Sequence, residues 1–537
     1  MTIEDCFNYL APNAGNSVPV WPPDAFGLCA YILQKSGAYT TVVAGWPPLA
    51  PTAGVKWSKW MKEVGLKWRD LSVKIVPDVP PEINTWWAGL VAVRGTVLHD
   101  LLEPRNKSVC EALLQIMAAA DEACNGIGMP GKSLDLFEEK VRDLFHRQTK
   151  QGEPNSTVCT ELISAAKLCV LPKSHTPQSG MTIRSLTHNL ALCSGGEVSL
   201  DWWHGLHSLG RELETDLNLL LVPWPTTVAP PHFSAVTQAN CPLQDMPDQY
   251  GFFDYKIRGG KSWPGPQFDT LLKAAVGMVG RIDGVVLPEL ALRPDEVEGV
   301  WQQIKTVSRN SFLIAGVGAQ SQPGNFGENR VTCILPLGND QATELQQDKH
   351  HRWLLDNGQI KNYGLFKQLK ADHLWWENTQ LNPRRLKFIS LTPWLTLCCL
   401  ICEDLARQDP IADLIRSVGP NLVVALLMDG PQLKSRWPAR YATVLADDPG
   451  CSVLTLTSIG MARLCKPFGT GESRIVALWK DSRRGPFEIE MPYDAAGIIL
   501  CLHAEHVEQW TADGRSDEGA AASWVLNAIH PVSMGAF

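Results

Sequence analysis

The pattern of hydrophobic and polar positions divides the chain into a helical first part and an alternating second part. In the first part, apolar residues recur every three or four positions in the runs 109–120 and 134–145. This spacing places them on one face of an amphipathic helix. The run 158–170 is also interpreted as a helix, which ends at Pro172. The N-terminal part of the chain is therefore predicted to be mainly helical.

From about residue 211, short apolar runs alternate with helical patterns. Continuous apolar runs of strand length occupy 217–222, 283–290, 311–318, 394–402, 421–428 and 451–458. Helical patterns lie between them at 268–280, 297–308, 411–419 and 440–448. Strands without polar alternation are buried on both faces, so this order predicts an α/β fold whose sheets are covered by helices.

The chain has 537 residues, which is more than one ordinary hydrophobic core accommodates, so at least two domains are predicted. The polar stretch 146–157 contains Gly and Pro and is interpreted as a loop or linker. We expect a helical accessory domain at 1–155, a helical connector at 156–210, an α/β domain at 211–515 and a C-terminal tail at 516–537.

Composition narrows the class of protein. Lys and Arg number 48 and Asp and Glu 56, so the net charge of −8 offers no basic field for nucleic acid or an anionic membrane. No apolar run reaches the roughly 20 residues that span a bilayer, and the start MTIEDCFNYL lacks the features of a secretory signal. The 15 cysteines are scattered, mostly within apolar stretches, as is typical of reduced thiols. We expect a cytoplasmic protein that binds neither membrane nor nucleic acid.

Three polar residues interrupt or closely follow these apolar runs. They are Glu289 in VVLPEL, Lys349 in QQDKHHRW and Cys402 in LCCLICEDL. A carboxylate at the end of a buried strand is costly unless it has a partner or a task. A cysteine between a strand and an acidic, helix-starting segment is placed as a nucleophile would be. Each residue alone also fits an ordinary role in a loop, on a solvated face or in the core, but their order and context favour a reactive site.

The order Glu, Lys, Cys resembles that of the carbon–nitrogen hydrolase (nitrilase) superfamily. The intervals are 349 − 289 = 60 and 402 − 349 = 53 residues. DGVVLPEL resembles the glutamate strand of that family, and ICEDL resembles its cysteine elbow in the form found in glutaminase domains of glutamine-dependent NAD synthetases. The resemblance covers roughly residues 211–515. It implies a nitrilase-like αββα sandwich with an N-terminal, mainly helical accessory domain.

The resemblance also implies a reaction. Glu289 would act as general base, Lys349 would polarise the substrate oxygen, and Cys402 would be the nucleophile of a thioester-forming amidase or nitrilase. A thiol with a pKa of about 8.5 is mostly protonated at neutral pH, so a carboxylate must take its proton. The backbone N–H of Glu403 would join Lys349 in holding the oxyanion. Expected partners are a small amide or nitrile substrate and further copies of the chain, with no cofactor and no metal.

The sequence departs from the family pattern around the pocket. Members usually carry a second glutamate shortly after the lysine, whereas KHHRWLLDNGQIKNYGL offers only Asp356 and Gln359. The strand after the cysteine ends at Asp429, where Asn-Pro-Ser is usual. His350 and His351 are interpreted first as loop residues and second as lining of the pocket entrance. The residues expected to line the oxyanion and substrate site are Glu403, His350, His351, Asp356, Gln359 and Asp429.

Two other interpretations stay open. The missing glutamate and the long N-terminal extension also fit a nitrilase-like scaffold without turnover, which would bind a ligand or hold a protein partner through residues 1–210. The run KHHRWLLDNGQIKNYGL resembles the nitrilase-like branch found in bacterial anti-phage systems, which implies an effector role in defence. The run SGGEVS (194–199) resembles a pyrophosphate-binding loop but lacks its aspartate, so we interpret it as a glycine turn.

Overall fold

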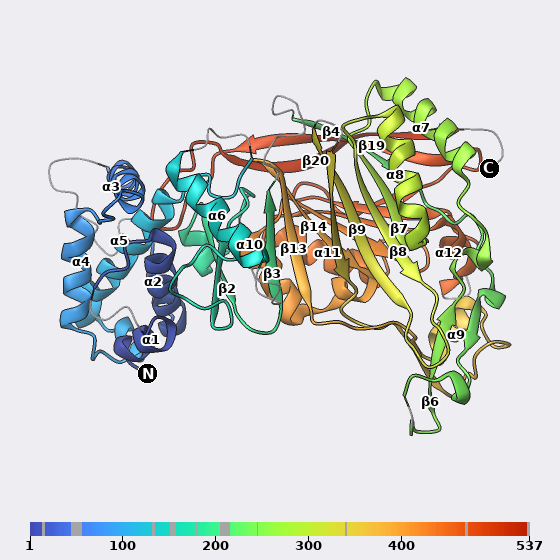
Figure 1. Cartoon of the computed structure of the whole chain (residues 1–537), viewed down its shortest axis with the longest axis horizontal. Coiled ribbons are helices and arrows are strands. Elements are labelled where there is room, and N and C mark those ends of the chain that lie inside the picture. The colour runs from blue at the N-terminus through green and yellow to red at the C-terminus, as the bar shows by residue number, and fades with distance from the viewer. Residues whose placement is uncertain are drawn as a thin grey trace.

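The computed structural model of the chain is shown in Figure 1. The residues that it describes are 1–12, 17–44, 56–130, 135–150, 157–178, 180–204, 215–243, 245–338, 341–467 and 471–533. Within these segments, no helix has both the length and the apolar character that crossing a membrane requires.

A helical lobe forms the N-terminal end of the molecule, drawn in blue in Figure 1. Its helices are α1 (Ile3–Leu10), α2 (Pro22–Ser36), α3 (Trp57–Ser72), α4 (Pro81–Ala92), α5 (Lys107–Ala123) and α6 (Leu136–Lys150). Helices α2, α3 and α4 all pack on α5, whose residues are almost entirely buried because it lies at the centre of the lobe. The predicted helices at 109–120 and 134–145 are confirmed by α5 and α6, although residues 131–134 lie outside the described segments.

The interpretation of 158–170 as a helix is wrong. The segment forms turns and then β1 (Leu168–Pro172), which pairs with β2 (Leu190–Ser194). The carboxylate of the buried Asp24 accepts backbone N–H groups from residues 161–163, with a shortest distance of 2.9 Å to Leu162. These long-range hydrogen bonds satisfy the backbone in a turn, and they override the helical spacing of the apolar residues.

The segments predicted as a connector and a tail also contain strands of the main sheets. β3 (Ser199–His204) pairs with β13 (Arg385–Thr392), and β20 (Ala521–Ser533) pairs along the whole of β19 (Ala495–Val507). The described residues of 156–210 therefore do not form a helical connector, and those of 516–537 do not form a tail, because both segments contribute edge strands to the main sheets. The predicted boundaries at 155/156 and 210/211 fall on residues outside the described segments.

Two seven-stranded sheets are found in the described part of the chain. The first has the order β10 (Gln341–Asp348), β9 (Glu328–Gly338), β8 (Phe312–Ala319), β7 (Gly284–Leu292), β4 (Asp216–Leu221), β19 (Ala495–Val507), β20. The second has the order β18 (Phe487–Glu490), β17 (Ile475–Lys480), β16 (Ser452–Thr457), β15 (Leu422–Leu427), β14 (Leu395–Ile401), β13 (Arg385–Thr392), β3. Parallel strands lie at the centre of each sheet, β4–β7–β8 in the first and β14–β15–β16 in the second.

The two sheets pack face to face with helices outside. Their facing side chains share one core, in which the Cys333 and Cys399 sulfur atoms are 3.8 Å apart across the interface. The outer face of the first sheet packs on α7 (Gly265–Val279) and α8 (Val297–Val307), and that of the second packs on α10 (Asp413–Val418) and α11 (Trp437–Asp447). The predicted αββα sandwich is confirmed, and so are the strands and helices predicted after residue 211.

A smaller sheet caps one end of the sandwich, at the lower right of Figure 1. Its strands are β11 (Leu354–Leu355), β12 (Leu374–Glu377), β6 (Tyr250–Tyr255) and β5 (Phe233–Ala235), in that order. Together with α9 (Asn357–Tyr363) and α12 (Ile459–Leu464), it encloses a separate apolar cluster that includes Trp353, Tyr363 and Met428. This cap covers the ends of the central strands.

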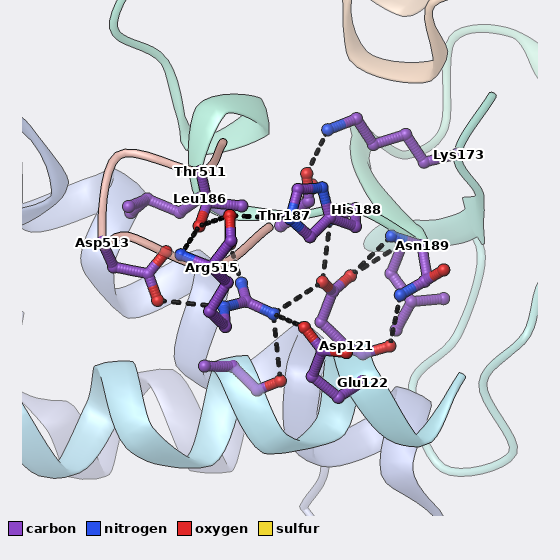
Figure 2. A network of polar contacts seen from close by, with 12 residues as sticks. Asp121, Glu122, Lys173, Leu186, Thr187, His188, Asn189, Thr511, Asp513 and Arg515 are labelled. Atoms are coloured by element: carbon purple, nitrogen blue, oxygen red, sulfur yellow. Dashed lines mark hydrogen bonds and ion pairs between the residues drawn. The ribbon is translucent and has the colours of Figure 1, made fainter. Parts of the chain in front are cut away.

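A buried ionic network joins the helical lobe to the sandwich (Figure 2). Arg515, in the connection between β19 and β20, donates to Asp513 at 3.0 Å, to Asp121 at 3.1 Å and to Glu122 at 2.8 Å. Asp121 and Glu122 lie on α5, and Asp121 also accepts the backbone N–H of His188 at 2.8 Å. One guanidinium thus connects the central helix of the lobe to the loop before β2 and to the C-terminal hairpin of the sandwich.

Candidate active site

Glu289 enters the site from a bulge in β7. The register between β7 and β8 shifts between Leu287 and Leu292, where Pro288 has no N–H to donate to a neighbouring strand. A Cβ atom on Gly316 of β8 would lie 2.4 Å from the Cα atom of Glu289, so only glycine lets the two backbones approach this closely. The bulge therefore depends on a proline in one strand and a glycine in the next. It removes Glu289 from the regular backbone pairing of β7 with β8.

Lys349 lies between two carboxylates directly after β10. Its Nζ atom is 2.7 Å from Oε1 of Glu289 and 2.5 Å from Oε2 of Glu377. The side-chain amide of Asn329 donates to both carboxylates, at 2.8 Å each. Lys349 is 1% exposed and Glu289 is 3% exposed, so this is a desolvated cluster in which every charge has an opposite partner.

Glu377 is the second glutamate that the sequence did not reveal. It does not lie in the residues just after Lys349 but at the end of β12, 28 residues further along the chain. Its carboxylate also accepts the backbone N–H of Trp353 at 3.1 Å. The alternation in LWWE was the available signal, because it places Glu377 on the same buried face as Trp375. Asn329 was missed as well, and no pattern in the sequence marks it.

Cys402 lies at a sharp turn between β14 and a short 3-10 segment, Cys402–Ala406. Its φ of 46° is in the left-handed region that residues with a Cβ rarely adopt. Such a turn ends β14 abruptly, so the Cys402 side chain no longer follows the alternation of side chains between the two faces of the strand. A strained strand-to-helix turn of this kind is how nucleophiles are presented in several hydrolase folds.

The electrostatic surroundings keep the thiol neutral and the lysine charged. Burial raises the pKa of Cys402 well above its ordinary value, and the negative charge of Glu289 raises it further while Lys349 lowers it. Burial lowers the pKa of Lys349, but the attraction of Glu289 and Glu377 outweighs this and raises that pKa well above its ordinary value. Burial and the like charge of Glu377 raise the pKa of Glu289. The cluster thus holds a thiol, an ammonium and a basic carboxylate whose charges act on one another.

His350 and His351 connect the loop that carries Lys349 to the turn that carries Cys402. The buried carboxylate of Asp404 accepts the backbone N–H of His350 at 3.1 Å and bonds Nδ1 of His351 at 2.9 Å. Nε2 of His350 is 3.0 Å from the backbone oxygen of Arg385. Asp404 follows Cys402 by two positions, so these contacts fix Lys349 and Cys402 relative to each other. This arrangement agrees with the loop interpretation of the two histidines.

Asp429 lies beside the cluster but is committed to other partners. Its carboxylate accepts the hydroxyl of Tyr363 at 2.5 Å and pairs with Arg436 at 2.7 Å. The preceding backbone N–H, that of Met428, donates to Oε2 of Glu289 at 2.6 Å. The end of β15 therefore positions Glu289 through its backbone, and the negative charge of Asp429 contributes to the raised pKa of Cys402.

The remaining predicted lining residues have structural roles in this conformation. Asp356 is exposed and caps α9 by accepting the backbone N–H of Gln359 at 2.8 Å. The side chain of Glu403 pairs with Arg407 on the surface of the elbow. Among the hydrogen bonds of the described residues, none joins Asp356, Gln359 or the Glu403 side chain to Glu289, Lys349 or Cys402.

The reactive groups are enclosed in this structure. Cys402 is 2% exposed and belongs to the hydrophobic core between the two sheets. A cavity of about 380 Å³ opens beside the cap, between α9, α12 and residues 226–230. Its wall includes Tyr363, the residue that donates to Asp429. The cavity therefore reaches a residue that contacts Asp429 at the end of β15.

Comparison with solved structures finds similar proteins in the nitrilase superfamily. An amidase from Nesterenkonia AN1 is 10% identical over 52% of this chain and 88% of its own, with a TM-score of 0.29. A CN-hydrolase superfamily protein from Xanthomonas campestris is 15% identical over 53% of this chain and 90% of its own, with a TM-score of 0.30. Nit3 of Saccharomyces cerevisiae is 12% identical over 52% and 87%, with a TM-score of 0.32.

No family model matches the chain, and no curated protein matches it in sequence. The fold itself is an αββα sandwich with an added helical lobe. The roles of Glu289, Lys349 and Cys402 therefore depend on the geometry of this site and on the motifs that carry them.

Proposed function

We propose that the chain is a carbon–nitrogen hydrolase of the amidase or nitrilase type with Cys402 as its nucleophile. The observation that carries this proposal is the Lys349 ammonium held at 2.7 Å from the Glu289 carboxylate, with both charges acting on a thiol at a strained strand end. A purely structural ion pair has no need of a strained cysteine beside it. The combination supplies a base, an electrophilic cation and a nucleophile in one enclosed volume.

The first half of the reaction forms a thioester. Glu289 takes the thiol proton as the Cys402 sulfur attacks the amide carbon, so the C–S bond forms while the S–H bond breaks. Lys349 and the backbone N–H of Glu403 stabilise the charge that develops on the substrate oxygen. The protonated Glu289 then gives its proton to the leaving nitrogen, the C–N bond breaks, and ammonia or an amine departs.

The second half releases the acid. Glu289, again ionised, takes a proton from water as the water oxygen attacks the thioester carbon. The C–S bond then breaks, and the proton on Glu289 returns to the Cys402 sulfur. Glu377 holds Lys349 in position through both halves and Asn329 holds Glu289, since each makes a direct hydrogen bond to that partner.

A second candidate function is a scaffold that binds without turnover. The observation that favours it is the enclosure of the site, in which Cys402 is 2% exposed. A hydrolase requires the cap to open for substrate, whereas a scaffold has no such requirement.

The two functions are separated by ammonia release across a panel of primary amides and nitriles. The panel is tested with wild type, with Cys402→Ala, and with Cys501→Ala as a matched control whose half-buried thiol lies on β19, outside the site. Hydroxylamine is added in a parallel series, because it intercepts a thioester and gives a hydroxamate that mass spectrometry detects.

For a hydrolase, Cys402→Ala loses about 10³-fold or more of the activity, and its hydroxamate disappears, while Cys501→Ala behaves as wild type. Equal ammonia release by wild type and Cys402→Ala would remove the assigned nucleophile. Absence of release from every substrate, with correctly folded wild type, would favour the scaffold.

A further inference from the structure

A second cavity lies between the helical lobe and the sandwich, away from Cys402. Its volume is about 500 Å³, which is in the range of sites for small organic ligands. Its walls come from α2, the β1–β2 hairpin, the 3-10 turn that includes Arg184, and α10. The charged and aromatic residues that line it are Tyr9, Tyr31, Lys35, Tyr39, Lys167, Arg184, Asp413, Arg416 and Asp448.

Arg184 is a buried cation without a carboxylate at hydrogen-bond distance among the described residues. Its guanidinium donates to neutral oxygens, the Thr176 hydroxyl at 2.6 Å and the Pro449 carbonyl at 3.4 Å. Its Nε–H has no hydrogen-bond partner in the described part of the structure, although the residue is only 5% exposed. Burial lowers the pKa of Arg184 to about 10, as expected for a guanidinium without a close counterion. A buried cation of this kind is favourable only when an anion is supplied.

Two lysines at the mouth of the cavity add to this positive charge. The Lys35 ammonium lies 5.5 Å from the centre of the Tyr31 ring, and that of Lys167 lies 5.1 Å from the centre of the Tyr9 ring. Both stack against aromatic rings, and no described carboxylate lies within ion-pair distance of either. The two acidic residues of the wall, Asp413 and Asp448, instead lie near Arg416 at 3.4 and 3.6 Å. The negative charge of Asp448 also acts on Arg184, and the Lys167 ammonium donates to the backbone carbonyl of Tyr9, but no described carboxylate forms an ion pair with Arg184, Lys35 or Lys167.

The same cavity presents aromatic surface. Tyr9 is 47% exposed, and its ring centre is 6.3 Å from that of Tyr31, while Tyr39 is half-buried on the same wall. Exposed tyrosine rings beside cations provide stacking surface for a planar, electron-rich ring. Ser194 and Gly195, from the SGGEVS run, also line the cavity and add backbone and hydroxyl groups close to the cations.

We propose that this cavity binds a nucleoside phosphate, with the phosphate on Arg184, Lys35 and Lys167 and the base against the tyrosines. The proposal joins two independent features of the wall, three cations without an ion-paired carboxylate and a set of tyrosine rings of which Tyr9 is exposed, and one ligand of this class satisfies both. It does not depend on hydrolysis by Cys402. The cavity floor is α10, which begins 11 residues after Cys402 (413 − 402), so the ligand would contact the helix that follows the cysteine elbow.

Isothermal titration calorimetry on the full chain tests the proposal with AMP, ATP, GMP, UMP, adenosine and inorganic phosphate as separate probes. The key variant is Lys35→Glu combined with Lys167→Glu, since both side chains lie at the mouth of the cavity rather than in the core. The matched control is Lys59→Glu combined with Lys434→Glu, which makes the same charge change at residues that do not line the cavity. Arg184→Gln is a second variant, whose folding is checked by thermal unfolding.

The expected result is that at least one nucleotide binds wild type and the control equally, and binds the key variant at least about tenfold more weakly. That nucleotide also binds more tightly than adenosine and than phosphate. The proposal is overturned if no nucleotide binds wild type, or if the key variant binds as tightly as the control. Binding of phosphate or of adenosine as tight as that of every nucleotide would also overturn it, because one half of the site would then be unused.

Discussion

Three charged groups, the Lys349 ammonium and the carboxylates of Glu289 and Glu377, lie together where water is excluded. The balance of their charges sets the basicity of Glu289. Two carboxylates and one ammonium leave a net negative charge, which burial makes costly. Part of that cost is offset by Asn329, which donates to Glu289 and Glu377 at 2.8 Å each. The remaining cost is reflected in the pKa of Glu289, which is raised by burial and by the like charge of Glu377. Glu289 is thereby a stronger base than an exposed glutamate, as the removal of a thiol proton requires.

Replacement of the second carboxylate tests this balance. In Glu377→Gln the like charge near Glu289 is gone, so the pKa of Glu289 falls and the base ionises at lower pH. Activity that needs ionised Glu289 is lost as pH falls through this pKa, so the acidic limb of kcat/KM moves to lower pH. The maximum falls about 10- to 100-fold because Lys349 is less well positioned. The measurement is a pH–rate profile beside the exposed control Glu298→Gln, and an unmoved acidic limb would contradict the argument.

The backbone of Cys402 makes a prediction about stability that is separate from catalysis. At a φ of 46°, alanine retains the steric cost of a Cβ atom, whereas glycine does not. We expect Cys402→Gly to unfold at a higher temperature than Cys402→Ala, by about 0.5–1 kcal/mol in the free energy of unfolding. At Cys399, in the regular part of β14, the order should reverse, since glycine destabilises ordinary strands. The same order at both positions would mean that the elbow is unstrained.

At the level of elements, the site depends on how β7 and β8 fit together. The Cβ atom introduced by Gly316→Ala would lie 2.4 Å from both the Cα atom of Glu289 and the carbonyl oxygen of Pro288. Backbone atoms cannot yield as a side chain can, so the bulge must shift and carry Glu289 with it. We expect a loss of about 1–3 kcal/mol of stability and about 100-fold in activity.

The control for this substitution is Gly277→Ala on α7, where a Cβ atom would meet nothing within 4 Å. It should unfold at or above the wild-type temperature, because alanine suits a helix better than glycine. Thermal unfolding and ammonia release are measured on both variants. If the two substitutions have equal effects, the close approach of β7 and β8 does not position Glu289.

The sandwich was predictable because its strands are buried on both faces and its helices on only one. Continuous apolar runs therefore mark the strands, and apolar residues at every third or fourth position mark the helices. The segment 158–170 was not, since its turns depend on Asp24, more than 130 positions earlier in the chain. The strand β20 was missed because its pairing with β19 is long-range and its sequence carries polar residues toward its end. Local sequence patterns indicate the local preference for helix or strand, whereas hydrogen bonds between distant segments determine the secondary structure of these two segments.

The candidate site likewise contains some residues that the sequence predicts and others that it does not. Glu289 and Cys402 follow strand motifs that are visible in the sequence, and the structure brings Glu289 to 2.7 Å from Lys349. Glu377 was not predictable from spacing, because β11, α9 and a loop separate it from Lys349. Asn329 contributes through a side chain on β9 whose neighbours in sequence are ordinary strand residues. The catalytic roles of these residues stay a proposal until the variants are measured.

On the scale of the whole molecule, the Arg515 network connects the helical lobe to the sandwich (Figure 2). Arg515 is fully buried, and it is shared by the carboxylates of Asp121, Glu122 and Asp513. Asp121 is further held by backbone N–H groups of residues 188–190. One cation cannot compensate three anions in a dry interior, so one of the carboxyl groups is expected to carry a proton.

We expect Glu122 to be that group and to make the stability of the lobe–sandwich junction depend on pH. Burial raises the pKa of Glu122 to about 7, and Asp121 opposes the stabilising pull of Arg515. A carboxyl group whose pKa is higher in the folded state than in the unfolded chain favours folding at low pH. Its contribution is complete below the unfolded value of about 4.5 and is lost as pH rises to about 7. Glu122→Gln keeps an oxygen for Arg515 without this titration.

We therefore expect Glu122→Gln to match wild type near pH 5 and to be more stable near pH 8, by about 1–3 kcal/mol. The measurement is the thermal unfolding temperature of both proteins from pH 5 to pH 8, with exposed Glu63→Gln as control. Limited proteolysis at the same pH values reports whether the lobe separates from the sandwich before the sandwich unfolds. A constant difference between Glu122→Gln and wild type across this range would show that another group holds the proton, because only titration of Glu122 makes the difference grow with pH.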